Sequence, residues 1–271
     1  MIGLWTYDDR GESEMPMLAR LFLLAVGAAS IFMPSSPPLA QPAGQGPIRT
    51  VLALGRVPSM VEAPMHLKLS RVALPAGAAA TYRGDHSTVY VLTGTLSVTT
   101  GRDSRKLQQG EGTYLASGVD VTLRAEPNAA TLLQYQLLTA ANLAKPSMNT
   151  PASVTELHRM AIPADTLKPG PYEFSLIHVT LSGRGLPSAR PHTRSGAALY
   201  YVLAGGAITI WPAATVNALS GESRTEVRAA GAIQEEPYGF IHSWSPKADA
   251  ALVLLQANVS QEGVPEIIFV K

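Results

Sequence analysis

The stretch Tyr200-Tyr201-Val202-Leu203-Ala204-Gly205-Gly206 decides the fold, because it reads as a β-strand that runs into a tight glycine turn. A matching stretch, Val89-Tyr90-Val91-Leu92-Thr93-Gly94, lies 111 positions upstream. A strand-and-turn unit that occurs twice at this distance predicts a chain built from two similar halves of about 105 residues each.

Two further matches extend this pattern beyond the strand. The segment from Gly110 to Gly118 matches the segment from Gly231 to Gly239 in spacing, at an offset of 121 residues. Leu132-Leu133-Gln134 then matches Leu254-Leu255-Gln256 at an offset of 122. The larger offsets place about ten extra residues in one hairpin of the second half, around residues 213–222.

Short apolar runs alternate with turn residues along most of the chain, which is typical of strands and hairpins. In the first half the expected strands are Ala63–Val72, His86–Leu92, Thr95–Thr100, Gly112–Ala116, Asp120–Glu126 and Thr131–Leu138. In the second half they are Tyr172–Ser182, Ala197–Leu203, Ala207–Trp211, Thr225–Arg228, Ala232–Glu236, Ile241–Trp244 and Ala250–Val259. Helical periodicity is absent from segments longer than about ten residues. The pattern predicts an all-β protein made of two tandem barrels.

Composition excludes several classes of function. The 271 residues contain no cysteine, so disulfides and cysteine-based zinc sites are excluded. The net charge of +1, with no basic stripe, gives no reason to expect a nucleic-acid partner. The 23 glycines and 21 prolines indicate many turns rather than long helices.

Residues 1–40 read as a signal peptide for export. Arg20 precedes an apolar run from Leu21 to Met33, and small and proline-rich residues then lead to a cleavage point after Ala40. The polar, acidic residues 1–14 fit a start codon assigned too early. An uncleaved anchor is the alternative, but a run of 13 residues is short for a membrane span. We therefore expect a periplasmic or secreted protein with no membrane contact after cleavage, and a mature net charge of +3 from 19 basic and 16 acidic residues.

The composition also suggests where the halves begin and end. Residues 41–47 are linker-like, and the small, polar segment from Ala140 to Pro151 separates the two halves. We expect one barrel over residues 48–145 and a second over residues 152–271.

The second half resembles a cupin. The second cupin motif, which reads Gly, five residues, Pro-x-Gly, two residues, His, is intact as Gly231, Pro237, Gly239 and His242. The first motif reads His-x-His, three or four residues, Glu, six residues, Gly, and it is partial. His192 takes the first His position and Gly205 the closing Gly, but Arg194 replaces the second His and Ala198 the Glu. The same alignment of the first half gives Thr81, Arg83, Ser87 and Val121 at the four ligand positions. The resemblance implies a bicupin of two jelly-roll barrels over residues 50–271, with the first barrel degenerate and structural.

The resemblance also implies where a metal would bind. Cupins hold a first-row divalent ion with two or three His and one Glu, and such ligands suit iron, manganese, nickel or zinc. His192 and His242 are the two ligands retained in the second half, and Glu236 or Gln234, just before the Pro-x-Gly turn, is the nearest residue to complete the set. The alternative is that both histidines are inherited barrel-lining residues without a metal.

Arg194 introduces a second kind of site. A permanent cation repels a divalent ion, but it binds a carboxylate or phosphate through a bidentate pair. Tyr200 and Trp244 are candidates to line the same pocket. The alternative is that they belong to the hydrophobic core, as aromatic residues in a barrel more often do.

Three functions therefore stay open. The first is a small-molecule enzyme with one divalent metal, dioxygenase-like or an isomerase or decarboxylase, whose catalytic residues the sequence does not identify. The second is a metal-free binding module in which Arg194, His192 and Trp244 hold an anionic or sugar-like ligand, with Tyr200 as a further candidate for the pocket. The third is a structural barrel that assembles into a homo-oligomer.

Overall fold

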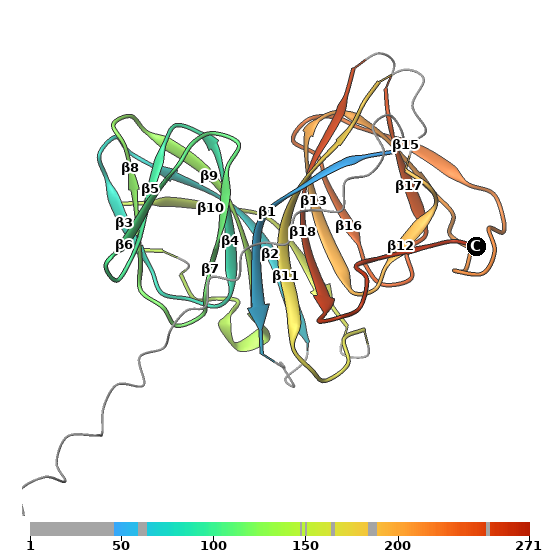
Figure 1. The fold of residues 1–271 in the computed structure, drawn as a ribbon, viewed down its shortest axis with the longest axis horizontal. Helices are drawn as coiled ribbons and strands as arrows, with labels where there is room; N and C mark the ends of the chain where they lie inside the picture. The colour runs from blue at the N-terminus through green and yellow to red at the C-terminus, as the bar shows by residue number, and fades with distance from the viewer. Residues whose placement is uncertain are drawn as a thin grey trace, which may run out of the picture. The chain divides into compact units, whose positions relative to one another are not determined.

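The described part of the chain is almost entirely β-structure (Figure 1). The computed structural model describes residues 46–58, 64–146, 148–149, 151–163, 166–183, 189–247 and 250–271. The export signal predicted over residues 1–40, and residues 41–45 of the predicted linker, lie outside these ranges. Within them the single helix is a 3₁₀ turn, η1 (Ala140–Asn142), and no helix has the length and apolarity that crossing a bilayer requires.

The strands form four sheets. Sheet A has the order β1 (Ile48–Val57), β11 (Tyr172–Leu181), β18 (Leu252–Gln261), β13 (Ala197–Ala204), β16 (Ile233–Glu236). Sheet B has the order β10 (Ser153–Ile162), β2 (Met65–Leu74), β9 (Ala130–Thr139), β4 (Ser87–Thr93), β7 (Gly112–Leu115). Sheet C has the order β3 (Ala79–Tyr82), β8 (Val121–Ala125), β5 (Leu96–Thr100), β6 (Asp103–Leu107). Sheet D has the order β15 (Arg224–Arg228), β14 (Gly206–Ile210), β17 (His242–Pro246), β12 (His192–Arg194), β19 (Ile267–Phe269).

Each strand expected from the sequence has a counterpart in these sheets, which confirms the all-β class. Six strands lack such an expectation: β1, β3, β6, β10, β12 and β19.

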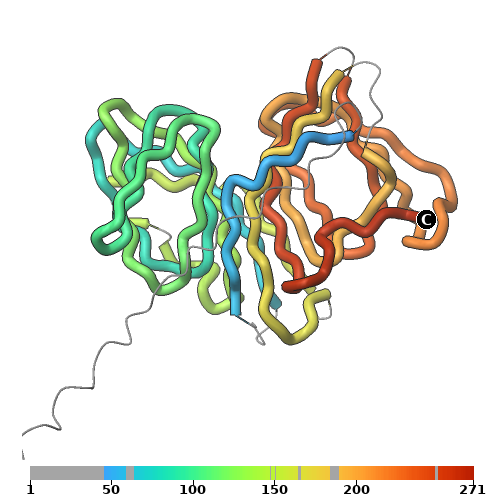
Figure 2. Tube along the Cα trace, viewed as in Figure 1, coloured from blue at the N-terminus to red at the C-terminus, as the bar shows by residue number. Residues whose placement is uncertain are grey.

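Two of those six strands pair across the expected boundary between the halves. β1 precedes every strand of sheets B and C in the chain, yet it pairs antiparallel with β11 in sheet A. β10 follows them, yet it pairs with β2 in sheet B. Figures 1 and 2 show the blue β1 alongside the yellow β11. Residues 48–57 and 153–162 are therefore exchanged between the sheets that the rest of each half builds.

Three apolar clusters fill the space between these sheets. One lies between sheets B and C and includes Val72, Leu96 and Leu132. A second lies between sheets A and D and includes Val179, Ile208 and Trp244. We call sheets B and C the first sheet pair, and sheets A and D the second sheet pair. The third cluster packs the outer face of sheet B against that of sheet A.

The glycine matches noted in the sequence mark equivalent turns. Gly110 and Gly231 have φ of 90° and 87°, a left-handed conformation that disfavours residues with a Cβ. Each turn leads into a short strand, β7 or β16, at the edge of its sheet. Glu236, the last residue of β16, is thereby placed at the inner edge of the second sheet pair, where the candidate site lies.

Candidate metal centre

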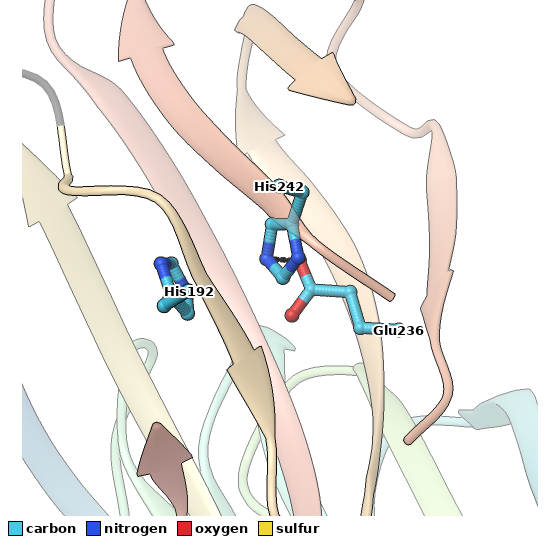
Figure 3. Close-up of side chains that lie close together, drawn as sticks. All are labelled: His192, Glu236 and His242. Carbon is cyan, nitrogen blue, oxygen red and sulfur yellow. Dashed lines mark ion pairs between the residues drawn. The ribbon is translucent and has the colours of Figure 1, made fainter. Parts of the chain in front are cut away.

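The three predicted metal ligands come from three strands and meet inside the second sheet pair (Figure 3). His192 begins β12 and His242 begins β17, and the register of these strands pairs the two residues directly. Glu236 ends β16, and the Pro-x-Gly turn of residues 237–241 carries the chain from there to His242. All three side chains are buried, with 3% exposure for His192 and 0% for the other two. Their ligand atoms lie within 4.8 Å of one another.

The carboxylate stands one strand away from the position that the cupin motif gives it. That position is Ala198 on β13, and Ala198 is the direct register partner of Glu236 on β16. Cross-strand partners present their side chains on the same face, so Glu236 fills the space that a glutamate at 198 would fill. Gln234, the other candidate ligand from the sequence, instead accepts a hydrogen bond from Arg228 and donates to the Glu235 carbonyl.

Hydrogen bonds to the backbone set the tautomer of both histidines. His192 Nδ1 lies 2.6 Å from the carbonyl oxygen of Arg190, and His242 Nδ1 lies 3.0 Å from that of Phe240. A carbonyl only accepts, so each Nδ1 carries a proton, and Nε2 is the nitrogen that each ring can offer to a metal when the ring is neutral. Metal-bound histidines show this arrangement, with one ring nitrogen tied to a backbone carbonyl and the other on the ion.

The Nε2 atom of His242 has no satisfied hydrogen bond. It lies 2.7 Å from Glu236 Oε1, which Figure 3 marks with a dashed line, but the two atoms are not aligned for a hydrogen bond. Within the described residues this buried nitrogen has no other partner. Two such atoms at this distance are stabilised by a proton on Nε2, which makes an ion pair, or by a divalent ion bound at about 2.0–2.2 Å to each. The donor set therefore fits a metal.

Electrostatics keep His192 and Glu236 in the states that bind metal. Burial is the largest effect on His192, and with the nearby His242 and Arg194 it lowers the pKa of His192 from 6.5 to about 3. That ring is neutral at physiological pH. Burial alone would raise the pKa of Glu236, but His242 and Arg194 outweigh it and hold that pKa well below its ordinary value. Glu236 is therefore a carboxylate.

Arg194 lies in the site and is bound to the protein's own carboxylate. Its Nε donates to Glu236 Oε2 at 2.9 Å, and a second nitrogen donates to Glu266 Oε1 at 3.4 Å. A third donates to the hydroxyl of Tyr200. Burial opposes the charge on Arg194, but Tyr200 and Glu236 outweigh burial and raise its pKa.

Tyr200 and Trp244, the other predicted ligand-binding residues, belong to the same network. Tyr200 donates to Gln256 Oε1 at 2.9 Å, and Trp244 Nε1 donates to Glu236 Oε1 at 2.7 Å. Their rings lie 5.9 Å apart within the apolar cluster between sheets A and D. Both side chains thus hold Glu236 and Arg194 in place from the core.

Three members of this network were not singled out from the sequence. Gln256 donates a hydrogen bond to Glu266, which is itself a partner of Arg194. Arg49, on the exchanged strand β1, forms an ion pair with Glu266. The sequence contains a feature that could have indicated Gln256, because this residue lies in the repeated Leu-Leu-Gln segment. Arg49 has no such feature, since its contact depends on which sheet β1 joins.

A pocket of about 380 Å³ lies next to the site. It is lined by the turn of residues 237–241 together with Ile210, Trp211, Pro212 and Arg224. Phe240 forms one wall, and its ring stacks on His242 at 5.2 Å between centroids. A small molecule in this pocket would be one ring away from the metal ligands.

Comparison with known proteins identifies the fold. No protein-family model and no curated protein matches the sequence. Among solved structures, the oxalate decarboxylase of Lactobacillus farciminis in its formate complex is similar, with 13% identity over 74% of this chain and 79% of that one, and a TM-score of 0.50. The oxalate decarboxylase of Bacillus subtilis at pH 4.6 shows 15% identity over 74% of this chain and 70% of that one, also at 0.50. At this identity the likeness concerns the fold, and it supports the cupin-type jelly roll that the motifs predict.

Proposed function

We propose that the second sheet pair binds one divalent transition-metal ion through His192, Glu236 and His242, and holds a small molecule beside it. The observation that carries the proposal is the meeting of three buried donor groups, whose ligand atoms lie within 4.8 Å of one another and whose His242 Nε2 has no hydrogen-bond partner among the described residues. Two imidazoles and one carboxylate form a donor set that suits iron, manganese, nickel or zinc and leaves coordination positions open.

The bound ion would supply Lewis acidity toward an oxygen of the small molecule, as in dioxygenase-like cupins and related isomerases or decarboxylases. The chain supplies orientation. The backbone carbonyls of Arg190 and Phe240 hold the two rings, and Arg194 with Trp244 holds the carboxylate of Glu236. Such outer partners make ligand atoms more basic and fix their direction. Burial of the site keeps bulk water away from the reacting groups.

The proposal places this site in an exported bicupin. The first sheet pair and the second sheet pair would each be one jelly-roll barrel, related by the sequence matches at offsets of 111 to 122 residues. Export rests on the signal-like residues 1–40. The fold does not determine the reaction, since one barrel serves many activities.

Metal titration tests the proposal directly. We expect purified protein, stripped with chelator and titrated with Fe²⁺, Mn²⁺, Ni²⁺ and Zn²⁺ in a calorimeter, to bind one equivalent of at least one ion. Glu236→Gln and His242→Asn each remove one ligand and should weaken binding by about 100-fold or more.

His158→Asn is the matched control, because His158 pairs with Glu235 at 2.6 Å outside the site. It should leave the metal affinity unchanged. A protein that binds none of the four ions would reject the metal site. Arg194, already paired with Glu236, would then stabilise a metal-free binding module or a structural barrel.

A further inference from the structure

The inner face of sheet B changes from apolar to polar along its strands. Near one end, the register aligns apolar side chains from neighbouring strands, such as Val72 with Leu132. Toward the other end the same face carries a row of Lys68 on β2, Gln136 on β9 and Ser87 on β4. The next row contains Ser70 and Gln134 as direct partners. These five polar side chains lie side by side, and all are at least 94% buried, Lys68 being the most exposed at 6%.

Several polar atoms of this group have no partner. The amide oxygens of Gln134 and Gln136 and the hydroxyl of Ser70 are buried without a hydrogen bond in the described part of the chain. The ammonium group of Lys68 forms no hydrogen bond or ion pair with any described residue, although its nitrogen is not among the fully buried atoms. The single internal hydrogen bond of the group runs from Gln134 Nε2 to Ser87 Oγ at 3.1 Å. A buried polar atom left unpaired costs about 1–3 kcal/mol, and an unpaired charge costs more.

The charged residues around Lys68 do not neutralise it. Asp85 and Glu156 favour its charge from beyond ion-pair distance, and Arg159 opposes it. Glu156 already pairs with Arg159 at 2.7 Å, and Asp85 accepts a hydrogen bond from Asn142 at 2.9 Å. Burial is the largest effect and lowers the pKa of Lys68. The lysine therefore has no direct partner for its charge and lies beside three oxygens without hydrogen bonds.

We propose that this row in the first sheet pair is a binding site for a small hydroxylated monocarboxylate. The ammonium of Lys68 donates to the carboxylate of such a ligand. The amide oxygen of Gln136, in the same row as Lys68, accepts the one hydrogen bond that its hydroxyl group donates and that a plain carboxylate does not offer. A single lysine balances one negative charge, so a dianion such as phosphate would retain an unpaired charge in a buried place.

This site is independent of the metal proposed in the second sheet pair. None of its five residues is a histidine or carries a carboxylate. On the edge strand β7, the residue next to Ser87 in the row is the apolar Leu115. The inference therefore assigns a ligand to the half of the chain whose motif positions carry none of the cupin metal ligands.

Calorimetric titration of the full, chelator-treated chain tests the site with glycolate, acetate and phosphate as probes. We expect glycolate to bind with one equivalent, acetate to bind about 3- to 10-fold more weakly because it lacks the hydroxyl, and phosphate to bind more weakly than either. Lys68→Met should weaken glycolate binding by at least about 10-fold. Gln136→Leu should bring glycolate and acetate to similar affinities.

Two controls locate the ligand. Lys106→Met removes a lysine that is 65% exposed and pairs with Glu126 on the outside of the same sheet pair, and it should leave glycolate affinity within twofold. The double variant His192→Asn/His242→Asn should do the same. Loss of glycolate binding in the double variant would assign the ligand to the second sheet pair and overturn the proposal. The proposal would also be overturned if the wild-type chain did not bind glycolate, in which case the polar row would contain only water. Phosphate binding as tight as that of glycolate would overturn it as well.

Discussion

The inner faces of sheets A and B carry opposite charges at corresponding rows. In sheet A the row runs through Ser175, Asn258, Ala198 and Glu236. In sheet B it runs through Lys68, Gln136, Ser87 and Leu115. Glu236 and Leu115 each stand five residues after a turn glycine, Gly231 or Gly110, so the rows correspond in sequence as well. One interior presents an anion and the other a cation.

The two interiors also differ in how their charge is satisfied. Glu236 accepts hydrogen bonds from Arg194 and Trp244, and Arg194 in turn has Tyr200 and Glu266. Lys68 has no partner of this kind among the described residues. A buried charge inside a connected hydrogen-bond network helps to specify one folded structure. A buried charge without a partner is costly, and a bound ligand of opposite charge would reduce that cost. The corresponding rows of sheets A and B have the same geometry. In sheet A the row belongs to an internal hydrogen-bond network, and in sheet B we propose that it binds a ligand.

The largest expected effect comes from breaking the network of sheet A. Glu236→Ala leaves the buried Arg194 with only its longer contact to Glu266, at 3.4 Å, and we expect a loss of about 3–5 kcal/mol in the free energy of unfolding. The double variant Glu236→Ala/Arg194→Met removes the arginine charge and should recover most of this loss. Urea denaturation of the three proteins measures both changes. A double variant no more stable than Glu236→Ala would show that the pair is not the source of the loss.

The second effect is a pH dependence that His192 should add to the second sheet pair. Because the folded pKa of His192 is about 3 against 6.5 when unfolded, the unfolded chain binds the extra proton between these values. The stability from this group is therefore complete above pH 6.5 and falls as the pH is lowered, by about 2–3 kcal/mol between pH 7 and pH 4.5.

The His192 dependence is measured as the difference between wild type and His192→Asn in chelator-treated protein, across urea titrations at several pH values. The variant should lose less stability on acidification. The first half has Thr81 at the corresponding motif position, but burial also lowers the pKa of His66 and His86 there, so the difference between wild type and variant is what isolates His192. Parallel pH profiles for wild type and variant would contradict the low pKa.

The sequence predicted local structure well and sheet membership poorly. Strand periodicity and turn glycines located every strand on which the site is built except β12, because both depend on neighbouring residues alone. The exchange of β1 and β10 depends on which sheet edge is available to each strand once the other strands have paired. No local pattern carries that information, so the expected boundary at residues 140–151 does not separate the sheets.

The candidate site shows the same division. Motif spacing indicated His192 and His242, and proximity to the turn indicated Glu236, and the structure brings all three together. Metal binding by them stays a prediction. Lys68 escaped notice for a physical reason: a polar residue alternating with leucines in a strand ordinarily faces solvent. Here Leu67 and Leu69 face the cluster between sheets A and B, so Lys68 faces inward.

A third effect compares the two glutamines of the repeated Leu-Leu-Gln segments. Gln256→Leu removes the acceptor of the Tyr200 hydroxyl and a contact with Glu266, leaving a buried donor unpaired. We expect a loss of about 1–3 kcal/mol. Gln134→Leu removes one hydrogen bond to Ser87 and an oxygen that had no partner, so its stability should stay within about 1 kcal/mol of wild type. Thermal unfolding of both variants checks the contrast, and equal losses would remove the distinction between the two interiors.

The smallest expected effect is a gain in stability in the first sheet pair. Lys68→Met replaces a largely buried lysine that has no direct charge partner by an apolar side chain of similar length, and we expect about 1 kcal/mol of added stability in ligand-free protein. Lys106→Met, on the exposed side of the same sheet pair, should change stability by less than about 0.5 kcal/mol. Urea midpoints at equal slopes measure both. A loss of stability in Lys68→Met would mean that the ammonium is already satisfied within the folded chain, and the contrast between a self-contained network and an open charge would then fail.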